Sequence, residues 1–171
     1  MKTDDELMVD FAAGNLSAAE LLFFRYKDPA YSWLKNVIGD ASVCEDLYHD
    51  AWLGVIKNAS KFKGQGFRSY FWSIVRNRTI DLIRKKRPSL ILDVESDNIE
   101  GRTMIDDIED DKAIGVLEKM EKEERYALLR NAMKQLPYKQ REVLFLRVSG
   151  GLEFKEISAE IGVPLNTVLV R

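Results

Sequence analysis

The side chains that most often carry chemistry are scarce in this chain. It has 171 residues with one cysteine, Cys44, and one histidine, His49, too few for an internal disulfide or a Cys/His zinc site. It has no glycine-rich loop of the kind that cradles phosphate, and no arrangement of a nucleophile with a base. We therefore expect a protein that is not an enzyme and that needs no metal and no cofactor.

Acidic residues cluster around these two positions. Glu45, Asp46, His49 and Asp50 follow one another at helical spacing, and Asp46 and Asp50, four apart, share one helix face. Two carboxylates on one face could pair with basic residues of a partner protein. A solvated acidic face is the alternative, and the residues alone favour it because runs of charge usually just face water. Cys44 is expected to be a small, partly buried side chain near a helix start.

Charge is segregated along the chain, although the net charge is only −2. Residues 1–60 carry ten acids and five bases (−5), and residues 61–87 carry nine bases and one acid (+8). Residues 88–124 carry thirteen acids and four bases (−9), and residues 125–171 carry eight bases and four acids (+4). The overall balance conceals two basic blocks, which indicate a nucleic-acid partner.

Aromatic residues accompany the first basic block. In residues 61–87 the lysine and arginine side chains would contact DNA phosphates and release counterions. The aromatic rings could hold unpaired nucleobases by stacking. An apolar stripe at helical spacing, however, is more often core than a platform for bases. We therefore expect Phe71, Ile74 and Tyr70 to be buried, and the pattern leaves Trp72 undecided.

Helical patterning runs through the first half of the chain without a convincing strand, so the expected fold is all-α. Three capping boxes, each a hydroxyl residue followed three positions later by glutamate, predict helix starts. They are Thr3 with Glu6, Ser17 with Glu20, and Ser42 with Glu45. The second start opens one long helix, or two helices broken near Pro29, ending at Gly39. On the third helix we expect Leu47, Ala51, Val55 and Ile56 to line one apolar face.

The composition divides the chain into three parts. Residues 1–87 form an N-terminal helical bundle, and residues 88–112 are an acidic linker whose isolated aliphatic residues could dock on a surface. Helical patterning returns at about residue 113, and a second small domain occupies residues 113–171.

Residues 154–168 have the proportions of a helix-turn-helix. Ile157 and Ile161 would face inward, Gly162 would allow a left-handed turn, and Val163 and Val168 would hold the second helix. Two helices that pack in an ordinary bundle are the alternative.

Two stretches resemble a known family. Residues 67–84, FRSYFWSIVRNRTIDLIR, resemble region two of bacterial RNA polymerase sigma factors, and residues 44–52 are similar to the acidic helix of the same region. Residues 136–147, with the helix-turn-helix after them, resemble sigma region four. Both motifs stand in the expected order and separation, so the chain resembles the two-domain extracytoplasmic-function (ECF) sigma factors of the sigma-70 family.

The resemblance implies a protein that binds core RNA polymerase and directs promoter recognition and DNA melting in transcription initiation. The helix with Glu45, Asp46, His49 and Asp50 would dock on the clamp helices of the polymerase. The loop of residues 61–67 would hold a flipped base of the upstream promoter element, and the helix after it would lie near duplex DNA. The residues implied at DNA are Lys61, Lys63, Gln65, Arg68, Arg76, Asn77, Arg84, Lys85, Asn166, Thr167 and Arg171.

Further expectations concern the linker, partners and location. By resemblance, the acidic linker would occupy the active-site cleft and RNA exit path of the polymerase until RNA displaces it; a solubilising spacer is the alternative. An anti-sigma factor is an expected partner, because the family is usually restrained by one. No apolar run reaches the length of a membrane span and the N-terminus is acidic, so we expect a cytoplasmic protein without membrane insertion.

The C-terminus departs from the family pattern. The usual recognition helix continues with further basic residues, whereas here Thr167 and Val168 are followed by Leu169, Val170 and Arg171, the last residue. We expect a truncated recognition helix, loosely held at its end, that recognises the distal promoter element poorly.

Two other functions remain open from the sequence. The chain could be a helix-turn-helix regulator with a dimerising or ligand-sensing N-terminal bundle, although such a regulator has no need of the basic, aromatic segment 61–87. It could also be a sigma-like protein that binds polymerase or an anti-sigma factor without recognising DNA.

Overall fold

The computed structural model describes residues 2–86, 128, 131–133 and 135–171, and within them the regular structure is entirely helical. This confirms the predicted all-α class. The acidic linker and the first helical pattern after it lie outside the described residues. Within the described part of the chain, no helix combines the length and apolar character needed to cross a bilayer.

Helix α1 (Asp4–Ala12) begins where the sequence predicts it. The Thr3 hydroxyl accepts the backbone N–H of Glu6 at 3.2 Å, and the Glu6 carboxylate accepts the backbone N–H of Thr3 at 2.7 Å. Both halves of the capping box are therefore present. Leu7 and Met8 are buried and attach α1 to the bundle.

Helix α2 (Leu16–Ile38) is one continuous helix of 23 residues that contains Pro29, which settles the alternative left open by the sequence. It ends at Gly39, where φ is 79°, a left-handed conformation that glycine adopts without steric cost. The start predicted at Ser17 is wrong, because Asn15 occupies the N-cap position and Ser17 lies inside the helix.

Helix α3 (Ala41–Lys57) begins two residues earlier than predicted, because its N-cap is residue 40 and not Ser42. Asp40 is the N-cap, and its carboxylate accepts the backbone N–H of Val43 at 3.2 Å. Aspartate caps a helix at least as well as serine, so the earlier residue takes the role. Leu47 and its neighbours one turn apart are buried as expected, but Ile56 is 51% exposed, which corrects its assignment to the core. A short 3₁₀ turn, η1 (Ala59–Lys61), follows α3.

Helix α4 (Phe67–Lys86) supplies the centre of an aromatic core. The Phe71 ring centroid lies 4.7 Å from that of Tyr26 and 5.3 Å from that of Trp52. Phe71 is buried, as predicted. Trp72, whose burial the sequence left undecided, is buried as well. Tyr70 and Ile74 are only partly buried, contrary to expectation, because they lie on a different face of α4.

The C-terminal helices form the predicted helix-turn-helix. Helix α8 (Phe154–Ile161) ends at Gly162, where φ is 69°, and helix α9 (Leu165–Val170) follows. Ile157 and Val168 are buried, and the Ser158 hydroxyl donates to the carbonyl oxygen of Val163 at 2.7 Å across the turn.

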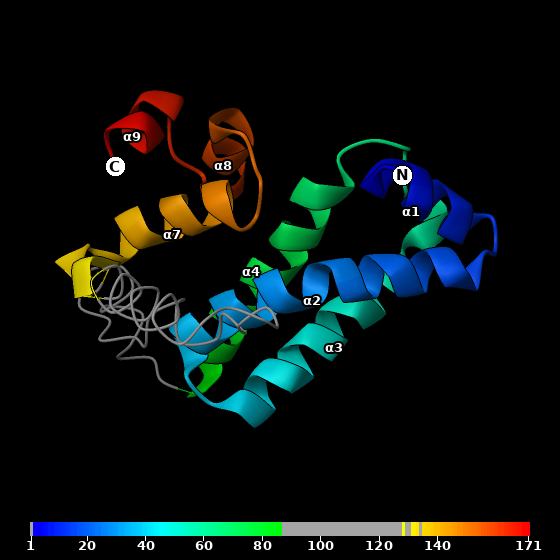
Figure 1. Ribbon diagram of the computed structural model, residues 1–171, viewed down its shortest axis with the longest axis horizontal. Helices are drawn as coiled ribbons and strands as arrows, with labels where there is room; N and C mark the ends of the chain where they lie inside the picture. The colour runs from blue at the N-terminus through cyan, green and yellow to red at the C-terminus, as the bar shows by residue number, and fades with distance from the viewer. Residues whose placement is uncertain (1, 87–127, 129–130, 134) are drawn as a thin grey trace, which may run out of the picture.

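Helix α7 (Tyr138–Val148) carries this unit onto the N-terminal bundle (Figure 1). The ring of Phe145 on α7 packs edge-on against that of Trp72 on α4, with centroids 5.3 Å apart. The two halves of the chain therefore share one hydrophobic core, with α4 between α3 and the C-terminal helices.

The packing around Phe71 predicts a large loss of stability on truncation. Phe71→Ala should lower the free energy of unfolding by about 3–5 kcal/mol, because it removes a fully buried ring from a close-packed cluster. Leu16→Ala is the matched control; Leu16 is 75% exposed, and its loss should change stability by less than about 0.5 kcal/mol. Urea unfolding followed by circular dichroism measures both, and similar midpoints for the two variants would contradict this description of the core.

Candidate nucleic-acid interface

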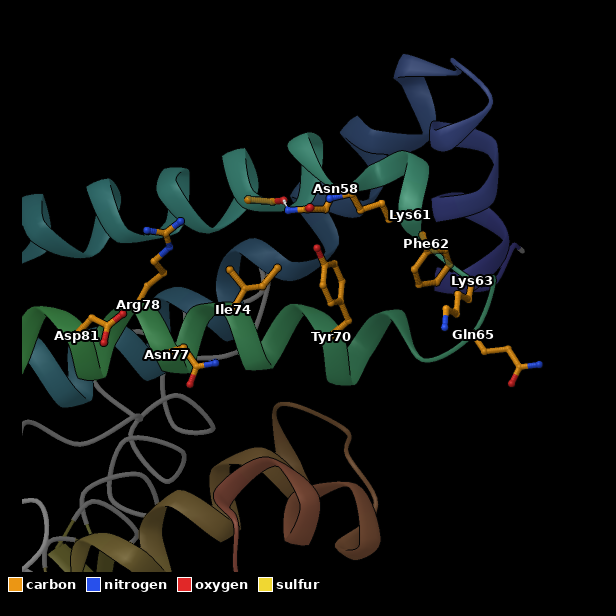
Figure 2. A pocket seen from close by; sticks show the side chains of 11 residues that line it. Asn58, Lys61, Phe62, Lys63, Gln65, Tyr70, Ile74, Asn77, Arg78 and Asp81 are labelled. Atoms are coloured by element: carbon orange, nitrogen blue, oxygen red, sulfur yellow. Dashed lines mark hydrogen bonds between the residues drawn. The ribbon is translucent and has the colours of Figure 1, made fainter.

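A groove lies between α3 and α4, on the face of α4 opposite the C-terminal helices (Figure 2). Tyr70, Ile74 and Arg78 recur every four residues on α4 and extend toward α3. The groove has a volume of about 660 Å³. Its lining, which we call the α3–α4 groove, consists of Gly54, Asn58, Lys61, Phe62, Lys63, Gln65, Tyr70, Ile74, Asn77, Arg78 and Asp81.

The α3–α4 groove combines flat apolar surfaces with polar edges. Phe62 and Tyr70 offer aromatic rings, and the Tyr70 hydroxyl, whose pKa partial burial raises above its ordinary value, can donate a hydrogen bond. The Asn58 side chain donates to the carbonyl oxygen of Gly54 at 2.9 Å, which fixes the amide at the groove wall. Rings for stacking with donors and acceptors around them are what an unpaired nucleobase needs.

The structure brings four of the residues expected at DNA to this groove. Lys61, Lys63, Gln65 and Asn77 line it, and all four are exposed. Arg84 is also exposed, further along α4, as is its neighbour Lys85. The sequence analysis missed Phe62, Tyr70, Ile74 and Arg78 as groove residues, although the four-residue spacing of the last three on one helix face was a usable signal.

Arg76 lies elsewhere, on the face of α4 that packs against the C-terminal helices. Its Nε lies 3.0 Å from Oε1 of Glu142 on α7, and its Nη1 is 3.5 Å from the carbonyl oxygen of Glu160 on α8. The Glu142 side chain is 5% exposed and that of Arg76 is 19% exposed. The ion pair is therefore largely buried. In this arrangement the Arg76 guanidinium bonds to other parts of the protein and faces little solvent.

Two serines on the same face of α4 also contact glutamates. The Ser69 hydroxyl donates to Oε1 of Glu156 at 2.7 Å, and the Ser73 hydroxyl donates to Oε2 of Glu160 at 2.6 Å. Together with the Arg76–Glu142 pair, these contacts form what we call the glutamate interface. Three carboxylates of α7 and α8 therefore occupy one face of the helix that was expected to meet DNA.

Arg68 contacts residues from both halves of the chain. Its Nη1 donates to the carbonyl oxygen of Gly151 at 3.0 Å, and its Nη2 lies 3.4 Å from Oδ2 of Asp4 on α1. The remaining expected DNA residues are on the helix-turn-helix: Asn166 and Thr167 are exposed on α9, and Arg171 is half-buried.

The acidic residues of α3 face solvent. Glu45, Asp46, His49 and Asp50 are all exposed, and the His49 ring stacks on Phe23 of α2 with centroids 6.1 Å apart. Cys44, expected to be partly buried, is completely buried. The four exposed residues are thus available to a partner.

Exposed apolar side chains lie on the same two helices. Leu53 and Ile56 on α3 are each 51% exposed, and Phe24 on α2 is 59% exposed. The ring of Phe24 packs edge-on against Phe23, the ring that stacks on His49. Acids beside exposed apolar groups are typical of a protein-binding surface, and the sequence analysis missed this apolar component.

The chain matches known families in both halves. The family model for sigma-70 region 2 matches residues 22–88, and that for sigma-70 region 4 matches residues 126–171. The ECF RNA polymerase sigma factor SigW of Bacillus subtilis is 32% identical over 149 residues, which span 85% of this chain and 78% of SigW. The ECF RNA polymerase sigma factor BldN of Streptomyces coelicolor is 26% identical over 161 residues, 92% of this chain and 57% of BldN.

The fold is also that of a solved protein. The structure of CnrH in complex with the cytosolic domain of CnrY matches 96% of this chain and 86% of CnrH, with a TM-score of 0.62 at 18% identity. A helical region 2 joined to a helix-turn-helix region 4 defines the class of sigma factors. The chain belongs to the sigma-70 family, as an ECF RNA polymerase sigma factor, and its function is promoter recognition.

The glutamate interface predicts a specific loss of stability. Glu142→Gln removes the charge that pairs with Arg76, and should destabilise the packing of α7 on α4 by about 2 kcal/mol, less than for a fully buried pair because Arg76 keeps some contact with water. Hydrogen exchange of the α7 amides should be faster as a result. Glu20→Gln, at an exposed position of α2, should leave exchange in α7 unchanged. Equal α7 protection in Glu142→Gln and the unaltered protein would show that the pair contributes nothing.

Proposed function

We propose that this sigma factor binds core RNA polymerase through the exposed surface of α2 and α3. The observation that supports this is the combination of Asp46 and Asp50 with the apolar side chains of Phe24 and Leu53. The carboxylates would pair with basic residues of the polymerase and set the orientation, while the apolar groups supply buried area. Glu45 and His49 would lie within the same contact.

Charge reversal on α3 tests the polymerase contact. The double variant Asp46→Lys with Asp50→Lys should weaken binding to core polymerase by at least about 100-fold, because two attractive pairs become repulsive. Helical content and melting temperature should stay unchanged, since both side chains are exposed. Asp10→Lys, on α1, is the matched control and should bind core polymerase normally. Unchanged affinity in the folded double variant would rule out this surface.

The DNA contact is proposed to centre on the α3–α4 groove. An unpaired base of the upstream promoter element would enter between Phe62 and Tyr70, with Lys63 and Gln65 at its edge. Lys61, Asn77, Arg84 and Lys85 would contact the backbone of the adjoining DNA. The single observation that carries this proposal is an aromatic, polar-edged groove in the most basic segment of the chain.

Arg68 and Arg76 have a conditional place in the proposed DNA contact. Arg76 pairs with Glu142, and Arg68 donates to Gly151, so neither guanidinium is directed at solvent alone. Because the Arg76 side chain is only 19% exposed, the C-terminal helices must move away from α4 before it can reach phosphate, whereas that of Arg68 is already 49% exposed. We propose that this separation accompanies binding to the polymerase, and that α8 and α9 then meet the distal promoter element through Asn166, Thr167 and Arg171.

Salt dependence tests the proposed backbone contacts. Replacing Arg84 and Lys85 together by alanine should reduce the slope of log affinity against log salt by about 2, since each lost phosphate contact removes about 0.9. The measurement is promoter binding by the variant in complex with core polymerase at several salt concentrations. Lys27→Ala, an exposed lysine of α2, should keep the original slope. An unaltered slope in the double variant would place the DNA path elsewhere.

The proposal extends to the organisation of the whole chain. Residues 1–87 would act as region 2, residues 88–112 as the acidic linker and residues 113–171 as region 4. The protein would act in the cytoplasm by binding alone, without a catalytic step of its own. CnrH, which shares the fold, is seen in complex with the cytosolic domain of CnrY, and this supports a protein partner, proposed to be an anti-sigma factor, for the present chain.

A further inference from the structure

The first turn of α4 is capped by a residue of α1 that is distant from it in sequence. The Asp5 carboxylate on α1 accepts the backbone N–H of Phe67 at 2.7 Å and that of Gly66 at 3.2 Å. Gly66, the residue before the helix, has no side chain with which to cap it locally. The first N–H groups of a helix have no partner within the helix, and a negative charge there is favourable. Asp5 satisfies this requirement across more than 60 residues of sequence.

The turn of α1 that carries Asp5 is held in place by the contacts of the preceding residue. Its neighbour Asp4 accepts the Tyr26 hydroxyl at 2.6 Å and pairs with Arg25 on α2 and with Arg68 on α4. Burial of Asp4 alone would raise its pKa, but the hydrogen bonds from Tyr26 and Arg25 and the charges of both arginines outweigh burial, and the net pKa lies below its ordinary value. Asp4 is therefore ionised at neutral pH and holds this turn of α1 against α2 and α4.

The loop that Asp5 anchors is the one that carries the edge of the α3–α4 groove. Lys63 and Gln65 alternate with Gly64 and Gly66, whose φ values are 81° and 75°. Glycines give a loop many alternative conformations, so a loop of this composition needs external contacts to stay in one of them. Helix α1 also approaches the loop at Gly64, where a Cβ atom, if the residue had one, would lie 3.8 Å from Cγ2 of Val9. Helix α1 thus lies against the loop at two points.

We propose that Asp5 is a positioning residue for base selection by the α3–α4 groove. By fixing Gly66 and the start of α4, it holds Gln65 and Lys63 at one distance from a base that enters the groove. This inference rests on the proposed function of the groove. It also assigns a role in promoter choice to α1, which lies outside the residues 22–88 that match the region 2 family model.

The test compares Asp5→Ala and Asp5→Asn with the unaltered protein, each in complex with core polymerase. Run-off transcription on promoters randomised across the upstream element gives the preference for each base at each position. Asp5→Ala should reduce the preference at one position by about tenfold, the effect of losing one charge-assisted contact, while preferences elsewhere and affinity for core polymerase change less than about twofold. Asp5→Asn keeps an acceptor oxygen without the charge, and should give an intermediate preference.

Two controls separate the possible failures. Asp10→Ala removes a carboxylate of the same helix that pairs with Lys2 instead, and should leave every preference unchanged. Gln65→Ala alters the groove directly. If Gln65→Ala changes a base preference but both Asp5 variants do not, the positioning role is wrong and the groove assignment stands. If Gln65→Ala changes none, the groove assignment fails first. A uniform loss at all positions in Asp5→Asn, with a lowered melting temperature, would make Asp5 a structural residue and overturn the inference.

Discussion

Burial of the aromatic face of α4 is the constraint on which the rest of the structure depends. Phe71 lies among Tyr26 and Trp52 of the N-terminal bundle, and Trp72 lies against Phe145 of α7. Side chains leave a helix in all directions around its axis, so the burial of these two rings fixes the rotation of α4. That rotation decides which side chains lie on the two remaining faces of the helix. The α3–α4 groove takes one, and the glutamate interface takes the other. Any change in the rotation of α4 would alter both surfaces together.

The sequence predicted those features that depend on local patterns. The Thr3 capping box, the end of α2 at Gly39 and the helix-turn-helix around Gly162 each require residues only a few positions apart, and each is present. The two misplaced helix starts have a local reason too. In each case a residue nearer the N-terminus, Asn15 or Asp40, occupies the N-cap position. Both are residue types that are common at N-caps, and the capping-box pattern does not show which of two possible N-cap residues begins the helix.

The surfaces of α4 could not be predicted in the same way, because they depend on partners distant in sequence. Tyr70 and Ile74 are residue types that are usually found in a core, and only the position of α3 makes them the wall of a groove. Arg76 is a residue type that often contacts DNA, and only the packing of α7 against α4 gives it a carboxylate partner. The motif that identifies the family therefore locates α4 in the sequence, but it does not say which side chains of that helix are exposed and which contact α7 and α8. The role of Asp5 is hidden for the same reason, since the backbone groups it meets leave no trace in residue type.

The glutamate interface also has a thermodynamic consequence. The Glu142 carboxylate competes with phosphate for the guanidinium of Arg76, so Arg76 can meet DNA only in a form of the protein in which α4 is uncovered. The apparent dissociation constant for DNA equals the intrinsic constant divided by the accessible fraction. If covering α4 is favourable by about 1.4 kcal/mol, roughly one molecule in ten is accessible, and the isolated protein binds DNA about tenfold more weakly than its contacts would allow. A partner that separates the two halves recovers that affinity without adding a single contact to DNA.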